Sequence, residues 1–186
     1  MSCTELYRFT NKGWPENIGE VKNAFRGAMS VWHILEEKYL PPYNPEWAKS
    51  LPASVKHEHY SRLSVRDKEE DLQEIWDMYK NENMSENDRI VLLSTFDNAV
   101  VYRKDIPRLL AAFRHFEGET SLMEQALIIE GALEAKDTYA IAWNQTSVGD
   151  PWCYCAGKHG DKAYNLFRGK NHLDVFFENL KSPSKK

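Results

Sequence analysis

Residues 89–118 read RIVLLSTFDNAVVYRKDIPRLLAAFRHFEG, and this stretch decides the fold class that the sequence predicts. Two apolar runs, Arg89–Phe96 and Ala99–Arg103, are joined by Asp97-Asn98, and both joining residues tolerate the left-handed backbone of a hairpin turn. Apolar residues three and four positions apart follow, and they predict an amphipathic helix that ends at Gly118. The stretch therefore predicts a β-hairpin within a sheet, followed by a helix that covers the sheet.

The elements expected after Gly118 extend this pattern. Ser121 and Glu124 have the spacing of a capping box and predict a second helix, and Thr138–Trp143 has the composition of a third strand. A hairpin around His159-Gly160-Asp161 and a last helix near the C-terminus complete the series. The order hairpin, two helices, strand, hairpin and helix predicts the α+β class, with an antiparallel sheet of about five strands packed by helices.

Residues 1–84 predict a mainly helical layer on this sheet. Asn17 and Glu20 have the spacing of an N-cap and its partner, and apolar residues at helical spacing predict a helix over Ile18–Tyr39. The stretch that follows, residues 43–62, lacks periodicity and predicts an ordered loop wrapped on the core. The residues expected to hold that loop on the core are Tyr43, Trp47 and Leu51.

The length and composition indicate one domain. A chain of 186 residues can bury a sizeable core, and 42% hydrophobic with 28% charged residues is ordinary for a globular protein. The domain is expected over residues 1–180, with the helical layer in 1–84, the sheet and its covering helices in 85–180, and a disordered tail in 181–186. The residues expected in the core are Leu109, Leu110, Phe113, Ile129, Ile141 and Trp143.

Charge and cysteine content argue against several classes of protein. The net charge of −4 argues against a general nucleic-acid binder, because such a protein needs a basic surface. The N-terminus lacks the apolar segment of a signal peptide, and no apolar run is long enough to span a membrane. Three cysteines make no disulfide framework. We therefore expect a cytoplasmic protein with reduced thiols and no membrane partner.

A concentrated acidic face is the first candidate binding surface. It belongs to a helix predicted over Val65–Tyr79, whose apolar residues lie on the opposite side. The acidic residues proposed to bind are Asp67, Glu70, Asp71, Glu74 and Asp77. Such a face attracts a basic partner protein by charge, although a solvated helix surface has the same composition.

A polar strand end is the second candidate. Asn144-Gln145-Thr146-Ser147 directly extends an apolar strand, and its amides and hydroxyls offer paired donors and acceptors to a ligand. The same residue types are also typical of a strand that ends in a surface turn. The sequence leaves both interpretations open.

Cys153 suggests an alternative function as a cysteine-dependent hydrolase or deamidase. His159 or His172 would serve as the base, Asp174 would orient it, and Gln145 would donate to the oxyanion. Cys153 lies within a predicted strand, however, whereas such nucleophiles usually begin a helix whose N-terminus lowers the thiol pKa. The opposing interpretation is a small buried thiol.

A metal-stabilised domain is a further alternative. Cys153 and Cys155 are two positions apart in a predicted strand, so both side chains would lie on the same face. His57 and His59 would complete a set of four soft ligands for zinc. Structural zinc sites usually draw their cysteine pairs from a turn with two or more residues between them. Packed thiols and solvated histidines are the competing explanation.

The leading functional hypothesis is a small, cytosolic, non-enzymatic protein-binding module. It would occlude or steady a partner protein, as inhibitors, immunity proteins and accessory proteins of mobile elements do. The sequence contains no glycine-rich phosphate loop, Gly-x-Ser-x-Gly elbow or His-Glu-x-x-His helix, and no cofactor is expected. The aromatic content of 12% and the acidic face favour a binding surface for a protein, which could be basic.

Overall fold

The structure of the protein is a computed structural model that describes residues 3–10, 15–22, 28–57, 60–65, 69–95, 99–145, 163–165 and 171–173. Its centre is a six-stranded sheet with the strand order β2-β1-β4-β3-β5-β6. The strands are β1 (Cys3–Thr10), β2 (Glu16–Lys22), β3 (Ala99–Tyr102), β4 (Thr138–Gln145), β5 (Ala163–Asn165) and β6 (Asn171–Leu173). Every neighbouring pair is antiparallel except β3 and β5, which run parallel.

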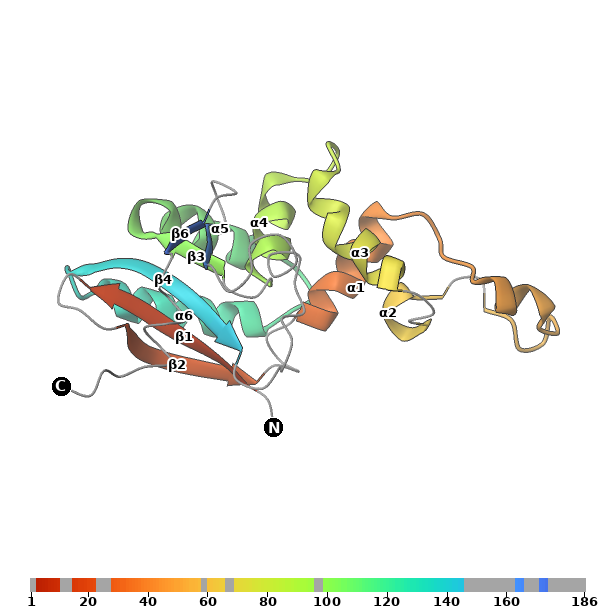
Figure 1. Ribbon diagram of the computed structural model, residues 1–186, viewed down its shortest axis with the longest axis horizontal. Coiled ribbons are helices and arrows are strands. Elements are labelled where there is room, and N and C mark those ends of the chain that lie inside the picture. The colour runs from red at the N-terminus through yellow and green to blue at the C-terminus, as the bar shows by residue number, and fades with distance from the viewer. Residues whose placement is uncertain are drawn as a thin grey trace.

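Helices pack on one face of this sheet and continue beyond its end. They are α1 (Ala28–Tyr39), α2 (Arg62–Val65), α3 (Glu69–Asp77), α4 (Glu86–Ser94), α5 (Ile106–His115) and α6 (Ser121–Leu133), with short 3₁₀ turns η2 (Glu46–Ser50), η3 (Met78–Lys80) and η4 (Arg103–Asp105). Helix α6 contacts β2 and β4, α5 lies between α6 and α4, and α4 contacts α1. In Figure 1, α1, α2 and α3 form a separate group beside the sheet.

The main core lies between the sheet and the helices. Trp143 of β4 is fully buried there, and its indole Nε1 donates a hydrogen bond to Gln125 Oε1 at 3.0 Å. A buried N–H without an acceptor would lower the stability of the protein, so this hydrogen bond stabilises the core. The core residues predicted from the sequence are all buried, which confirms them: Leu109, Leu110, Phe113, Ile129, Ile141 and Trp143.

The opposite face of the sheet carries a second apolar cluster. Its buried residues are Phe9, Val100, Ala140 and Ala142. The Tyr139 ring packs beside them, 6.0 Å from the ring of Phe9. Because β4 is buried on both faces, its sequence is almost wholly apolar between Tyr139 and Trp143.

The prediction of a hairpin around Asp97-Asn98 is wrong for the first of its two strands. Arg89–Phe96 was expected as a strand, but the chain forms helix α4 as far as Ser94. Ser85 caps this helix, because its side-chain oxygen accepts a hydrogen bond from the Asp88 backbone N–H at 3.1 Å. The four consecutive apolar residues Ile90–Leu93 are all buried, whereas Glu86 and Asn87 in the first turn of α4 are exposed. A short continuous apolar run does not by itself distinguish a buried helix segment from a buried strand.

The helix predicted over Ile18–Tyr39 is also wrong at its start, because residues 18–22 belong to strand β2; residues 23–27 lie outside the described residues. Asn17 lies in strand β2, and its Oδ1 accepts a hydrogen bond from the Gly19 backbone N–H, so it caps no helix. The pairing of β1 with β2 shifts register at Ile18, which forms a bulge. Ile18 and Val21 therefore both pack on the main core although they are three positions apart, and this spacing imitates a helix.

The fold class predicted from the sequence is confirmed. The chain forms one α+β domain whose sheet is antiparallel in its long strands. The N-terminal region differs from the expectation in contributing β1 and β2 to that sheet. The tail over residues 181–186 lies outside the described residues.

Candidate binding site at the projecting arm

Residues 41–57 and 60–61, which we call the arm, lie between α1 and α2 and project away from the rest of the domain (Figure 1). The sequence predicted that this stretch wraps on the core, and the structure corrects that prediction. The two ends of the arm pair with each other: the Tyr60 backbone N–H donates to the Tyr43 carbonyl at 2.9 Å. Four prolines restrict the backbone of the arm: Pro41, Pro42, Pro45 and Pro52.

Aromatic contacts give the arm a small core of its own. The Trp47 ring meets the Tyr60 ring edge to face at 5.1 Å, and the His57 ring meets the same tyrosine at 5.6 Å. The His57 backbone N–H also donates to the Tyr60 hydroxyl at 3.3 Å. Trp47 thus packs within the arm and not on the domain core, and the arm keeps a defined shape where it projects.

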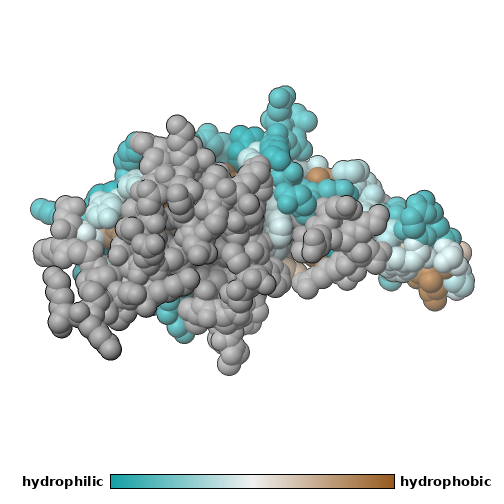
Figure 2. Space-filling view, viewed as in Figure 1, coloured by the Kyte–Doolittle hydropathy of each residue, from teal (hydrophilic) through white to brown (hydrophobic). Residues whose placement is uncertain are grey.

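The arm leaves large apolar side chains exposed. Trp47 is 44% exposed and Val55 is 55% exposed. In the space-filling view a hydrophobic patch stands out on the otherwise mixed surface of the arm (Figure 2). Tryptophan is among the residues that most often dominate binding energy at protein interfaces. The arm is therefore a candidate docking surface.

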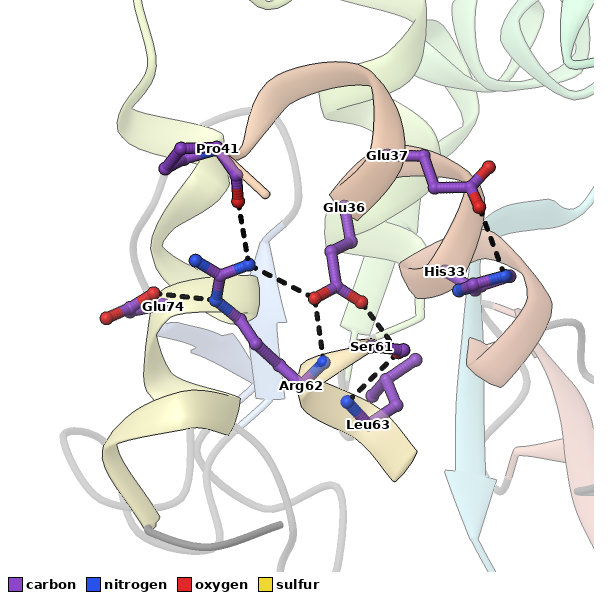
Figure 3. Close-up of polar contacts among 8 residues, drawn as sticks. All are labelled: His33, Glu36, Glu37, Pro41, Ser61, Arg62, Leu63 and Glu74. Carbon is purple, nitrogen blue, oxygen red and sulfur yellow. Dashed lines mark hydrogen bonds and ion pairs between the residues drawn. The ribbon is translucent and has the colours of Figure 1, made fainter. Parts of the chain in front are cut away.

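A buried ion pair holds the base of the arm to α1. Arg62 and Glu36 join at 3.2 Å between the guanidinium and Oε1, and their side chains are only 5% and 7% exposed. The Glu36 carboxylate also accepts hydrogen bonds from the Arg62 backbone N–H and from the Ser61 hydroxyl, both at 2.8 Å (Figure 3). Both carboxylate oxygens are engaged, so Glu36 serves the structure and is not open to a ligand.

Arg62 extends this network to three further parts of the chain. Its Nε donates to Glu74 of α3 at 2.7 Å, and its guanidinium donates to the Pro41 carbonyl at 3.2 Å (Figure 3). The guanidinium also lies over the Tyr43 ring, 4.8 Å from its centre. The planar group thereby fixes α1, α3 and both ends of the arm in one geometry, because its donors have set directions.

A pocket of about 360 Å³ opens between the C-terminal turn of α1 and the base of the arm. Its apolar walls come from Leu40, Pro42, Tyr43 and Tyr60. Glu37 lines it too, with a side chain that is 71% exposed and lies 3.4 Å from His33 Nε2 (Figure 3). The volume is near the lower end of small-ligand sites, which span roughly 300–1,000 Å³. It suits a side chain of a partner better than a large cofactor.

A second polar cluster ties α1 to α4. The Asp88 carboxylate accepts hydrogen bonds from Lys38 Nζ at 2.6 Å and from the Tyr39 hydroxyl at 2.5 Å. Burial is the largest influence on the pKa of Asp88 and raises it, but the hydrogen bonds from Lys38, Tyr39 and Ser85 together outweigh burial and lower the pKa below 3.8. The hydrogen bond to Asp88 raises the pKa of Lys38 in turn. The cluster is charged at neutral pH.

The structure pairs the described side chains of the predicted acidic face with this chain's own donors. Glu74 accepts from Arg62, and Asp77 accepts from Gln73 at 3.0 Å and pairs with Lys80 at 2.7 Å. Glu70 and Asp71 lie on α3, where only the backbone is described, and Asp67 lies outside the described residues. Glu74 thus belongs to the base of the arm as well as to the acidic face.

The polar strand end continues the sheet. Asn144 and Gln145 are the last residues of β4, and they pair with Glu5 and Thr4 of β1. Their side chains are not described, and Thr146 and Ser147 lie outside the described residues. The strand predicted to end at Trp143 is therefore two residues longer.

The residues of the cysteine and metal hypotheses fall mostly beyond the described part of the chain. Cys153, Cys155, His159, Asp174 and His59 lie outside it. His172 is in β6, where only the backbone is described, and His57 packs on Tyr60. Within the described ranges, no group of three or more His, Cys, Asp or Glu residues is placed to hold a metal ion.

Comparison of the chain with protein-family models, with curated proteins and with solved structures finds no match. Among the described residues, no helix combines the length and apolar character needed to cross a membrane.

The arm is the feature that sequence reasoning missed. Its signal was present in the four prolines, together with Tyr43, Trp47 and Tyr60, in a stretch without periodicity. Prolines and aromatics in a nonperiodic stretch indicate a stiff loop with its own contacts. That composition does not predict whether the loop packs on the core or projects, because the contacts that hold its base involve Arg62 and Glu36, which lie outside the loop.

Proposed function

We propose that the protein is a cytoplasmic, non-enzymatic protein-binding module that occludes or steadies a basic partner protein through the arm. The observation that carries this proposal is a preformed projection with exposed Trp47 and Val55 beside a pocket with a carboxylate at its rim. The partner would gain apolar contact on the arm and charge contact near α1.

The fixed shape of the arm supports this function on energetic grounds. Binding through a flexible loop loses affinity to the ordering of that loop. Here the Arg62–Glu36 network and the Tyr43–Tyr60 pairing have already ordered it. A projection held in this way also reaches into a concave partner, as an occluding protein requires.

The charge of the helical region supports a basic partner. Residues 28–95 contain thirteen acidic and eight basic residues, so this region is more negative than the whole chain at −4. Complementary charge accelerates association more than it raises affinity. We expect the acidic residues of the predicted face, Asp67, Glu70, Asp71 and Asp77, to contribute to this attraction at long range.

Partner capture with matched variants tests the proposal. The tagged protein and its Trp47→Ser/Val55→Ser variant are used to capture proteins from the cells that make it, with partners identified by mass spectrometry. Leu127→Ser is the control, because Leu127 is an exposed apolar residue on α6. We expect a basic protein to be captured by the wild type and the control and lost with the arm variant. Capture of the same protein by the arm variant would contradict the proposal.

Salt dependence tests the electrostatic part separately. Lys substitution of Asp67, Glu70 and Asp71 should slow association with the captured partner and remove most of its dependence on salt. An unchanged association rate would place the attraction elsewhere on the molecule.

The thiol and metal hypotheses have direct tests of their own. An activated Cys153 would react with an alkylating reagent at neutral pH, whereas a packed thiol would not. Elemental analysis of the purified protein would reveal a bound metal.

A further inference from the structure

We infer that the pocket between α1 and the base of the arm accepts one lysine or arginine side chain of the partner protein. This inference rests on the proposed function, because it names the chemistry of the contact next to the arm. Glu37 serves as the counter-ion, and the apolar side chains of Leu40, Pro42 and Tyr60 cover the aliphatic stem.

The charges around the pocket favour a cation. Three carboxylates lie in this region: Glu36 and Glu74 bond to the guanidinium of Arg62, whereas Glu37 points away from it toward His33 (Figure 3). Arg62 is already bonded to two of them, so its charge is neutralised within the network. Glu37 is the carboxylate left at the surface, where an incoming cation can reach it.

The end of α1 adds to this preference. Glu37 lies in the last turn of α1, which ends at Tyr39. The carbonyl end of a helix carries a partial negative charge and favours cations within its last turn. The Glu37 carboxylate and the C-terminal end of α1 therefore both favour a cation in the pocket.

Arg62 shows that this environment already holds a guanidinium. It lies over the Tyr43 ring and bonds to a carboxylate and to the Pro41 carbonyl. The pocket offers similar groups to a second cation: aromatic and proline walls for the stem and a carboxylate for the head. Lysine and arginine are suited to such a site because their stems pack on apolar surface while the charged end stays at the rim.

Amide chemical shifts measured by NMR with small probes test this inference. The probes are N-acetyl-lysine N-methylamide and the arginine analogue, added at millimolar concentration to the full-length protein. The norleucine analogue is the matched control, because it has the same stem without the ammonium. We expect saturable shifts at Glu37, Tyr43 and Tyr60 with the two cationic probes and none with norleucine.

Glu37→Gln should weaken binding of the lysine probe about tenfold, since a charge-assisted hydrogen bond becomes a neutral one. The matched control is Glu117→Gln, an exposed glutamate between α5 and α6, which should leave the affinity unchanged. Equal binding of norleucine, or equal affinity of the Glu37→Gln variant, would overturn the inference.

Failure of this inference and failure of the proposed function give different results. If capture of a partner depends on Trp47 and Val55 but not on Glu37, the arm binds the partner and the pocket does not take a cation. If the cationic probes bind and capture does not depend on the arm, the pocket inference holds and the proposed function fails.

Discussion

The sheet and the arm are held by different kinds of interaction. Around the sheet, Leu6, Phe113 and Trp143 are almost fully buried, and the stabilising contacts are chiefly apolar. At the base of the arm, the buried Arg62–Glu36 pair and its hydrogen bonds set the geometry. Apolar packing has no preferred direction, whereas a guanidinium with five donors does. Apolar packing is enough to stabilise a core, whereas a segment that projects in one direction is better held by directed hydrogen bonds.

The two regions meet at α1 and α4. The Trp32 indole of α1 donates to Thr95 Oγ1 at 2.8 Å just after α4, and its ring contacts Trp76 of α3. Gly118, with φ of 94°, lies so close to Ile34 of α1 that an added Cβ would come within 2.9 Å of its Cδ1. The sheet core and the helical region are therefore joined by buried contacts, although different forces dominate in each.

Phe113→Ala should have the largest effect on stability. Phe113 is 1% exposed in the main core, and truncation of such a residue usually costs about 3–5 kcal/mol. Chemical denaturation should show a lower midpoint, and Leu127→Ala, on an exposed position, should stay within about 0.5 kcal/mol of the wild type. An unchanged midpoint for Phe113→Ala would mean that α5 does not stabilise the core.

Arg62→Ala should destabilise the protein by about 3 kcal/mol, because it leaves the buried Glu36 carboxylate without its counter-ion. Hydrogen exchange should show the loss of protection at the Tyr60 amide, which bonds to Tyr43. Lys49→Ala is the control within the arm, because the ion pair of Lys49 with Glu46 is exposed and should contribute little to stability.

A double variant sharpens the comparison between the two regions. Glu36→Leu with Arg62→Met replaces the ion pair by apolar side chains, so stability should recover in part. Protection at Tyr60 should not recover, since apolar groups lack directed donors. Full recovery of both would show that the arm needs no polar network.

Asp88→Asn should cost about 1.5–3 kcal/mol at neutral pH, the usual contribution of hydrogen bonds to a charged group. The pKa of Asp88 is lowered on folding, so its contribution is present above pH 3.8 and is lost as the pH falls through the folded value. The pKa of Lys38 is raised, so its contribution is lost as the pH rises above 10.5. Urea unfolding at several pH values should show both losses in the wild type and smaller ones in Asp88→Asn.

Reversal of single acidic residues on α3 should have the smallest effects. Glu74→Lys should cost about 1 kcal/mol, because Glu74 is half exposed but bonds to the buried Arg62. Asp77→Lys should change stability by less than about 0.5 kcal/mol, since Asp77 pairs with Lys80 and Gln73 at the surface. Equal effects of the two reversals on stability would show that Glu74 does not stabilise the base of the arm.

The failures of sequence reasoning have identifiable physical causes. Arg89–Phe96 was predicted as a strand because the continuous apolar run Ile90–Leu93, which is buried within α4, shows no helical periodicity. The segment at Asn17 was predicted as helical because a bulge placed Ile18 and Val21 on one face at helical spacing. Of the residues predicted to form the acidic face, Glu74 bonds to the buried Arg62, and nothing in the local sequence links these two residues.

The sequence by itself determined the fold class, the burial of Phe113, Ile129, Ile141 and Trp143, and the strand and helices over Ala99–Leu133. These follow from local pattern and hydrophobicity, which act over a few residues. The tertiary structure alone decided the place of β1 beside β4, the identity of α4 as a helix and the direction of the arm. Each of these depends on contacts between residues far apart in the chain, such as Glu36 with Arg62, and no local pattern encodes such a pairing.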